Sequence, residues 1–161
     1  MSVSNFDSVA IESPATSTVA VKTVCEEKVV KVKVPSASVL ALNATPYTIL
    51  AAQGANTLIE FLGATVHKPA GTAYSGIASG EDLAFKYTNA SGAQVNTSLE
   101  TAGFLDQATA QTRIARAIAT EYTPVENAAL VLHLLSGEIT TGDSDLYISA
   151  RVRVWKNATK I

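Results

Sequence analysis

The sequence predicts an all-β fold: an antiparallel β-sandwich or barrel with an extended N-terminal arm and at most one short helix. Three observations support this prediction. Short runs alternate between apolar and polar residues, clusters of Gly, Pro, Asn and Ser separate these runs, and a single region has a helical pattern. The 161 residues are enough for one domain with a sizeable core.

The clearest strand pattern is a predicted long hairpin, residues 126–155. Its first arm, 126–135, is almost wholly apolar, so we expect it to be buried on both sides. Its second arm, 146–155, alternates with a period of two, which buries one face and exposes the other. A loop rich in turn-forming residues, 136–144, joins the two arms and completes the expected core hairpin.

The N-terminal part is predicted to be an arm with added strands. Residues 1–17 are small and polar, which indicates a flexible arm or one that orders only against a neighbour. Residues 18–24 predict a short strand, and 28–34 alternate between valine and lysine. Lysine on the open face of a strand guards against edge-to-edge pairing. We therefore divide the chain into residues 1–35, the arm and its strands, and residues 36–161, the β-sandwich body.

The body continues with a short apolar run, a turn followed by a strand, a long strand and a hairpin, at residues 38–42, 43–50, 57–67 and 81–97. Unbroken alternation in the long strand places Leu58, Leu62, Ala64 and Val66 on one face and Ile59, Phe61 and Thr65 on the other. Gly63 interrupts this pattern, so we expect a β-bulge near it.

Residues 98–120 are the region with a helical pattern. Asp106 could cap a helix whose apolar face contains Ala110, Ile114, Ala117 and Ile118, and a short helix followed by a strand fits equally well. We predict one or two helical turns near 99–109 and an extended segment at 112–119.

Composition argues against a nucleic-acid partner. The net charge is −2 and the 12 basic residues are scattered, apart from Lys28, Lys31 and Lys33, whereas a nucleic-acid surface needs clustered Lys and Arg. Charged residues make up 16% of the chain, below the usual fraction of about 25%. A neutral surface is poorly protected against association, so we expect partners to cover part of it.

No pattern in the sequence points to catalysis or to a cofactor. Phosphate-binding glycine loops, dinucleotide fingerprints and the Gly-x-Ser-x-Gly elbow of hydrolases are absent. His67 and His133 lie in strand patterns, and His133 is expected to be a core residue. A zinc site would have to depend on carboxylates. We therefore expect a protein that is not an enzyme, with no catalytic, cofactor-binding or metal-binding residues.

Two further features have simple interpretations. Cys25 is the only cysteine, which excludes an intrachain disulfide, and we expect it to be buried as a small hydrophobic residue. Asp143-Ser144-Asp145 resembles a loose calcium loop but lacks the glycine and the distant glutamate of an EF-hand. Solvated acids of a turn are the favoured interpretation.

The N-terminal residues have neither the basic start nor the apolar run of a signal peptide. No apolar stretch approaches the roughly 20 residues needed to cross a bilayer. We expect a protein made and kept in a cytosol, without a membrane partner.

A resemblance to a known family rests on six segments: Leu42–Ile49, Glu60-Phe61, Gly80–Tyr87, Gly103–Gln107, Glu126–Leu132 and Gly142–Ile148. In this rhythm of turns and strands, which covers roughly residues 40–155, the chain resembles small virion proteins of tailed bacteriophages. Those proteins are encoded beside the major capsid gene and are interpreted as head decoration (cement) proteins.

The resemblance implies an antiparallel β-sandwich or jelly-roll-like body, assembled as a homodimer or homotrimer, that binds the major capsid protein on the outside of an icosahedral head. It would cement neighbouring capsomers and stabilise the head against internal DNA pressure. Such a protein is made in the host cytoplasm and resides on the capsid exterior. The alternatives are a phage neck or tail adaptor or ring component, a carbohydrate-binding β-sandwich module and, third, an enzyme.

In this interpretation residues 1–34 are the main reach toward neighbouring subunits. Their apolar side chains lie outside the segments that carry the resemblance, and a wrapping segment is stabilised by folding on contact. The predicted capsid or partner contacts are Phe6, Val19, Val21, Val30 and Val32.

Overall fold

The computed structural model describes residues 24–78, 80–119 and 123–156. Their elements are β1 (Val24–Val34), α1 (Ser36–Leu40), β2 (Tyr47–Leu50), β3 (Thr57–Lys68), β4 (Leu83–Tyr87), β5 (Gln111–Arg116), β6 (Leu130–Leu134) and β7 (Leu146–Lys156). The predicted all-β, sandwich-like fold with at most one short helix is confirmed for these residues. No helix in this part of the chain is long and apolar enough to cross a membrane.

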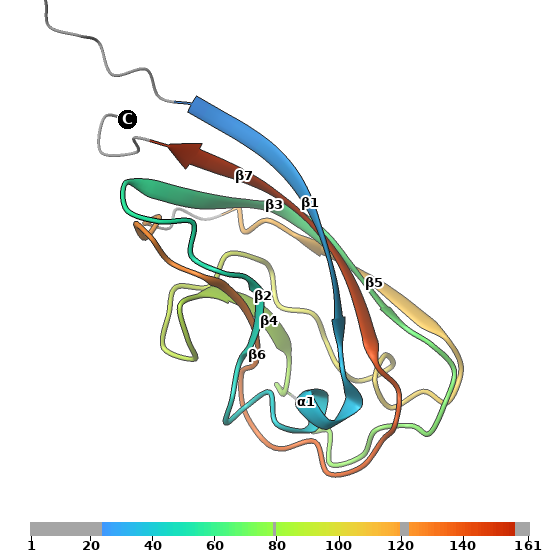
Figure 1. Cartoon of the computed structure of the whole chain (residues 1–161). Coiled ribbons are helices and arrows are strands. Elements are labelled where there is room, and N and C mark those ends of the chain that lie inside the picture. The colour runs from blue at the N-terminus through green and yellow to red at the C-terminus, as the bar shows by residue number, and fades with distance from the viewer. Residues whose placement is uncertain (1–23, 79, 120–122, 157–161) are drawn as a thin grey trace, which may run out of the picture.

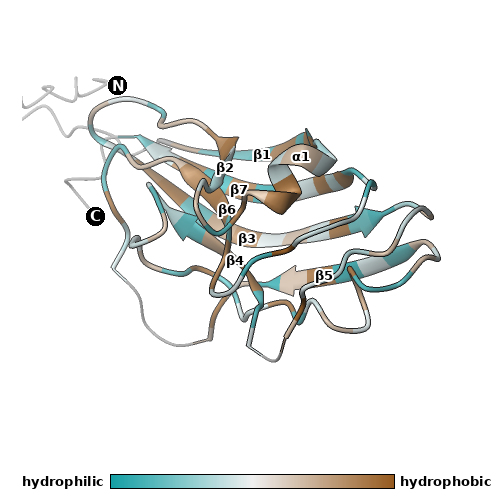
Figure 2. Ribbon diagram, turned by 90° about the horizontal axis from the view of Figure 1, so that it is seen from below, coloured by the Kyte–Doolittle hydropathy of each residue, from teal (hydrophilic) through white to brown (hydrophobic). Residues whose placement is uncertain are grey.

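Two antiparallel sheets form the layers of the sandwich. One has four strands in the order β1-β7-β3-β5, and the other has three in the order β2-β6-β4. Figure 1 shows the four-stranded sheet as a curved layer beside β2, β4 and β6, with α1 near one end. Apolar and polar bands alternate along its strands in Figure 2, as expected when one face is buried and the other is open.

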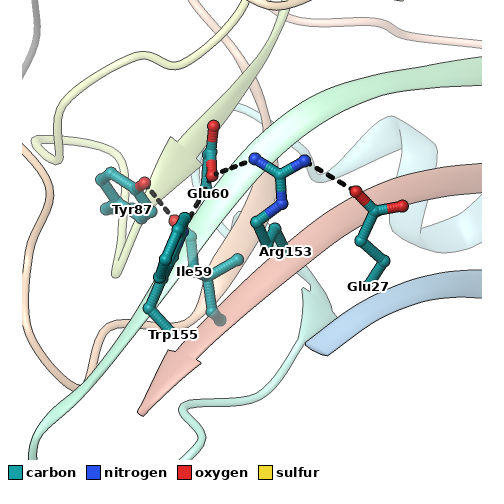
Figure 3. A network of polar contacts seen from close by, with 6 residues as sticks. All are labelled: Glu27, Ile59, Glu60, Tyr87, Arg153 and Trp155. Carbon is teal, nitrogen blue, oxygen red and sulfur yellow. Dashed lines mark hydrogen bonds and ion pairs between the residues drawn. The ribbon is translucent and has the colours of Figure 1, made fainter. Parts of the chain in front are cut away.

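The core lies between the two sheets. Phe61 on β3 stacks on Phe85 on β4, with ring centroids 4.9 Å apart and planes inclined by 25°. The hydroxyl of Tyr87 on β4 donates a hydrogen bond to the carbonyl of Ile59 on β3 (Figure 3). Such aromatic pairs add to the free energy gained by burial, and the tyrosine satisfies its polar end by joining the two layers.

The expected hairpin at residues 126–155 is wrong as a pairing, although the burial expected of its second arm, and of residues 130–134 in its first arm, is confirmed. All five residues of β6 are buried, and β7 alternates between buried and more exposed positions. However, β6 is the central strand of the three-stranded sheet, and β7 lies in the opposite sheet. Their connection is anchored elsewhere: Ile139 is buried, and the Thr140 N–H donates to the carbonyl of Ser75. This loop connects the three-stranded sheet to the four-stranded sheet.

The bulge expected at Gly63 is confirmed, since the pairing of β3 with β7 shifts register between Phe61 and Gly63. The faces assigned to the long strand are therefore wrong. Ile59 and Phe61 before the bulge share the buried side with Ala64 and Val66 after it. An inserted residue inverts the alternation, so one extra residue keeps apolar side chains of both halves in the core.

The helix lies at residues 36–40 rather than near 99–109. Pro35 ends β1, and the Ser36 N–H at the start of α1 donates to Asp145 at 2.9 Å. Residues 101–105 form only a hydrogen-bonded turn. Gly103 has φ +69°, a conformation that ends helical geometry. The extended segment predicted at 112–119 is confirmed for residues 112–116, which lie in β5.

Part of the predicted arm forms a strand of the sandwich. Residues 24–34 make up β1, which pairs with β7 along its whole length, and Val34 is fully buried. Within the described residues β1 is an edge strand, and Lys31 and Lys33 face away from the core, as predicted. Residues 1–23 lie outside the described residues.

Candidate interaction surface

The structure locates two of the five predicted contact residues. Val30 and Val32 lie on the core-facing side of β1, where both are partly buried and pack against the core. Phe6, Val19 and Val21 lie outside the described residues. Because Val30 and Val32 face inward, the side of β1 that is accessible to a partner carries other residues.

We define the outer face as the side of the four-stranded sheet that points away from the three-stranded sheet. The strand registers align its residues in rows that cross the strands. One row contains Glu27, Arg153 and Glu60, and the next contains Val29, Arg151, Gly63 and Arg116. The second of these is called the arginine row below.

At the end of the outer face near Trp155, polar groups satisfy one another (Figure 3). Arg153 contacts Glu27 at 2.7 Å and Glu60 at 3.2 Å, and the Trp155 indole N–H donates to Glu60 at 2.8 Å. The Arg153 guanidinium also lies 5.8 Å from the centroid of the Trp155 ring. We call these four residues the Glu60 network.

Charge pairing within this network shifts the ionisation of its members. The hydrogen bond from Arg153 lowers the pKa of Glu27 below its usual value, and the same bond raises the pKa of Arg153. Both effects favour the charged forms. The charged side chains at this end of the outer face therefore pair with one another.

The arginine row is different. Beside it lies an open groove of about 520 Å³, lined by Val29, Leu62, Gly63, Ala64, Thr65, Ile114, Ala115, Arg116, Ser149 and Arg151. Val29 is 60% exposed and Ile114 66% exposed. Arg116 and Arg151 form no ion pair and no side-chain hydrogen bond with another described residue. The groove thus combines open apolar surface with available cations.

A second, smaller hollow of about 360 Å³ continues the outer face toward the other end of β1. Tyr147, which lines it, is 46% exposed. Lys33 forms an ion pair with Asp145 at 2.7 Å, and His67 shares a hydrogen bond with Thr112 at 2.9 Å. Lys31 has no such partner among the described residues.

The side chains of Asp143 and Asp145 form hydrogen bonds and an ion pair with other segments of the chain. Asp143 accepts hydrogen bonds from the backbone N–H and the hydroxyl of Thr72, both at 2.7 Å, and Asp145 accepts from Ser36 and pairs with Lys33. These contacts lower the pKa of both carboxyl groups. No group of three or more His, Cys, Asp or Glu side chains that could hold a metal ion is found in the described ranges.

Two basic side chains, His133 and Lys68, are buried within the described residues. His133 is 5% exposed, as expected of a core histidine, and its Nε2 lies 3.2 Å from the carbonyl of Asn43. Burial lowers the pKa of His133, and the charge of Lys86 adds to that effect. Lys68 is fully buried and donates to the carbonyl of Gln107 at 2.6 Å. Its pKa is also lowered by burial.

The expectation of a buried cysteine is wrong. Cys25 is exposed, because it lies near the first residue of edge strand β1 and opposite Trp155, on the outer side of the sheet. Cysteine is usually buried in proteins, and the expectation followed that tendency. Here the position of Cys25 on the outer side of an edge strand makes it exposed.

Comparison of the chain with protein-family models, curated proteins and solved structures finds no match.

Proposed function

We propose that this protein is a structural virion protein, a cement protein that binds the outer surface of a phage capsid and stabilises the head. The resemblance over roughly residues 40–155 names the family, and the outer face supplies the physical support. In this proposal the partners are the major capsid protein and further copies of the chain, as a homodimer or homotrimer. It is made in the host cytoplasm, resides on the capsid exterior and has no enzymatic role.

The observation that carries the proposal is the outer face itself. It leaves the side chains of Val29, Ile114 and Tyr147 exposed to solvent on one side of a sheet whose other side packs against the core. Grouped exposed apolar residues mark surfaces that bind other proteins. Cement binding requires buried area repeated by symmetry, rather than chemistry.

The test is co-sedimentation of the purified protein with undecorated phage capsids, with the bound copies counted per capsid. We expect saturation at a copy number that matches the capsid lattice, together with greater heat resistance of the shells. Saturation at a few copies per particle would instead favour the neck or tail adaptor. Absence of binding would overturn both.

A truncation tests the role of the arm. Removing residues 1–34 would delete β1 and its pairing with β7, so the informative variant lacks only residues 1–23. If the arm is the main reach to neighbouring subunits, this variant binds capsids more weakly while its unfolding midpoint is unchanged. Equal binding by the truncated and full-length chains would remove the arm from the proposal.

A further inference from the structure

The geometry of the arginine row suits a ligand placed between two guanidinium groups. Gly63 on β3 lies opposite Arg151 on β7 and Arg116 on β5. Neighbouring strands are about 4.8 Å apart, so the Cα atoms of the two arginines are roughly 10 Å apart. Gly63 has no side chain to fill the space between them. The row therefore has a guanidinium group on each side of Gly63 and no side chain between them.

No carboxylate among the described residues contacts the arginines of this row, although the charge of Arg151 acts over a distance on Glu27, which pairs with Arg153. The residues that line the groove include no Asp or Glu, and Arg116 and Arg151 have no ion-pair partner among the described residues. Arg153, two residues along β7, contacts two glutamates. A guanidinium pairs best with a planar carboxylate, which accepts two parallel hydrogen bonds. The missing group at the arginine row is thus an acid.

Apolar side chains flank the two arginines, and they favour a partner that offers apolar groups as well as an acid. Val29 lies at the β1 end of the row, while Leu62 and Ile114 line the groove toward β5. A nucleic-acid backbone offers phosphates but little to contact these side chains, whereas a protein segment offers both kinds of group. In an extended segment, side chains two residues apart project from the same side at intervals of about 6.7 Å.

We propose that the arginine row docks an extended segment of a protein partner with the pattern apolar-x-acid-x-apolar. The carboxylate lies over Gly63 between Arg151 and Arg116, and the two apolar side chains contact Val29 on one side and Leu62 with Ile114 on the other. Only the identity of the partner, an exposed segment of the capsid protein, rests on the proposed function.

A peptide titration tests the docking without capsids. The probe is the peptide Gly-Val-Ser-Glu-Ser-Val-Gly, added to the full-length, isotope-labelled chain while backbone amide shifts are recorded. We expect the shifts to concentrate at Val29, Gly63, Ile114 and Arg151. The same peptide with Gln in place of Glu should bind roughly tenfold more weakly, because it loses the charge-assisted hydrogen bonds.

Matched variants separate the row from general charge. Arg116→Gln/Arg151→Gln should weaken binding of the Glu peptide by roughly tenfold. Lys28→Gln/Lys156→Gln removes the same number of charges from the other side of β1 and β7 and should leave the affinity unchanged. Val29→Thr/Ile114→Thr keeps β-branched residues at exposed positions and should weaken binding of both peptides.

Several results would overturn the docking. They are equal affinity for the Glu and Gln peptides, shifts away from the row, and tighter binding of an oligonucleotide at the same residues. Shifts that depend on protein concentration alone would assign the groove to a second copy. Tighter peptide binding after removal of residues 1–23 would assign it to the chain's own arm.

The two proposals fail separately. Peptide binding at the row by a protein that does not co-sediment with capsids would overturn the cement function and leave the docking intact. Capsid binding that survives Arg116→Gln/Arg151→Gln, without peptide binding by the unsubstituted chain, would overturn the docking alone.

Discussion

The two faces of the four-stranded sheet use the same strands for different purposes. On the inner face, residues such as Ile148 and Val152 are almost completely buried, whereas Ile114 and Val29 on the outer face are mostly exposed. Burial stabilises the fold in proportion to the apolar area removed from water. Stability is therefore concentrated on one face, and the other can change with little risk of unfolding.

A second contrast divides the outer face itself. The Glu60 network surrounds Arg153 with two carboxylates and an indole ring, whereas Arg116 and Arg151 in the adjacent row have no carboxylate partner among the described residues. A satisfied cluster has little to offer a ligand. An arginine pair beside exposed apolar residues resembles an interface more than a solvated surface, since Arg is enriched at interfaces.

The largest expected effect compares one substitution on the two faces. Ile148→Ala on the inner face should lower the free energy of unfolding by about 2–5 kcal/mol, because it leaves a cavity in a packed core. Ile114→Ala on the outer face, 66% exposed, should change it by no more than about 0.5 kcal/mol. Denaturant unfolding of both variants measures the difference. Similar losses would mean that the outer face is not open.

The next effect concerns the bulge that separates the halves of β3. Gly63 has φ +146°, and a Cβ atom there would lie 3.2 Å from the carbonyl oxygen of Ala115. Gly63→Ala should therefore cost about 1–3 kcal/mol of stability. Gly54 also has a positive φ, but a Cβ atom at that position would meet no heavy atom within 4 Å. Gly54→Ala should reduce stability less than Gly63→Ala. An equal loss would mean that the positive φ angle alone, and not the contact with Ala115, causes the loss at Gly63.

Local patterns predicted which residues are buried better than they predicted which strands meet. The alternation of 146–155 gave the correct burial, and so did the apolar run for residues 130–134, because side-chain direction depends only on the strand itself; residues 126 and 127 at the start of that run are exposed. Pairing β7 with β1 and β3 instead of β6 depends on long-range contacts that alternation does not encode. The turn-forming residues between the two strands fit both a hairpin and a connection between two sheets, so they did not distinguish the two arrangements.

The candidate surface was harder to predict for the same reason. Alternation over residues 146–155 puts Arg151 on the polar side of its strand, but the arginine row exists only because Gly63 faces both β5 and β7. Glycine at a bulge was visible in the sequence, and its consequence for the faces of β3 was missed. Ile114 was assigned to the apolar side of an alternative helix. The extended segment predicted at 112–119 places Ile114 and Ala115 on opposite faces, but alternation alone does not indicate that the face of Ile114 is the open one.

A smaller effect tests whether the Glu60 network is self-contained. Glu60→Gln keeps an oxygen that accepts from the Trp155 indole but removes the charge that pairs with Arg153. Exposed ion pairs contribute about 0.2–1 kcal/mol, so the loss of stability should be of that size. The emission of Trp155 should shift because its polar neighbour changes. Glu26→Gln, which affects only the pair with Lys28, should leave the emission unchanged.

The smallest effect is a dependence of stability on pH. The hydrogen bond from Arg153 lowers the pKa of Glu27 in the folded state below 4.5, the value expected without that contact. Below pH 4.5 the unfolded state binds more protons than the folded state, so stability falls as the pH falls through the lowered pKa. Glu27→Gln should reduce this acid sensitivity, as measured by unfolding midpoints above and below pH 4.5.

Arg153→Gln provides the matching arm of this experiment, because it removes the main cause of the lowered Glu27 pKa while Glu27 and the weaker effect of Arg151 remain. Glu27→Gln should show the larger reduction in acid sensitivity and Arg153→Gln a slightly smaller one, whereas Asp143 and Asp145, with lowered pKa values of their own, keep the remaining dependence. Neither variant should alter binding of the Glu peptide at the arginine row. A change in that binding would mean that the two ends of the outer face act as one surface, and the contrast between them would then be wrong.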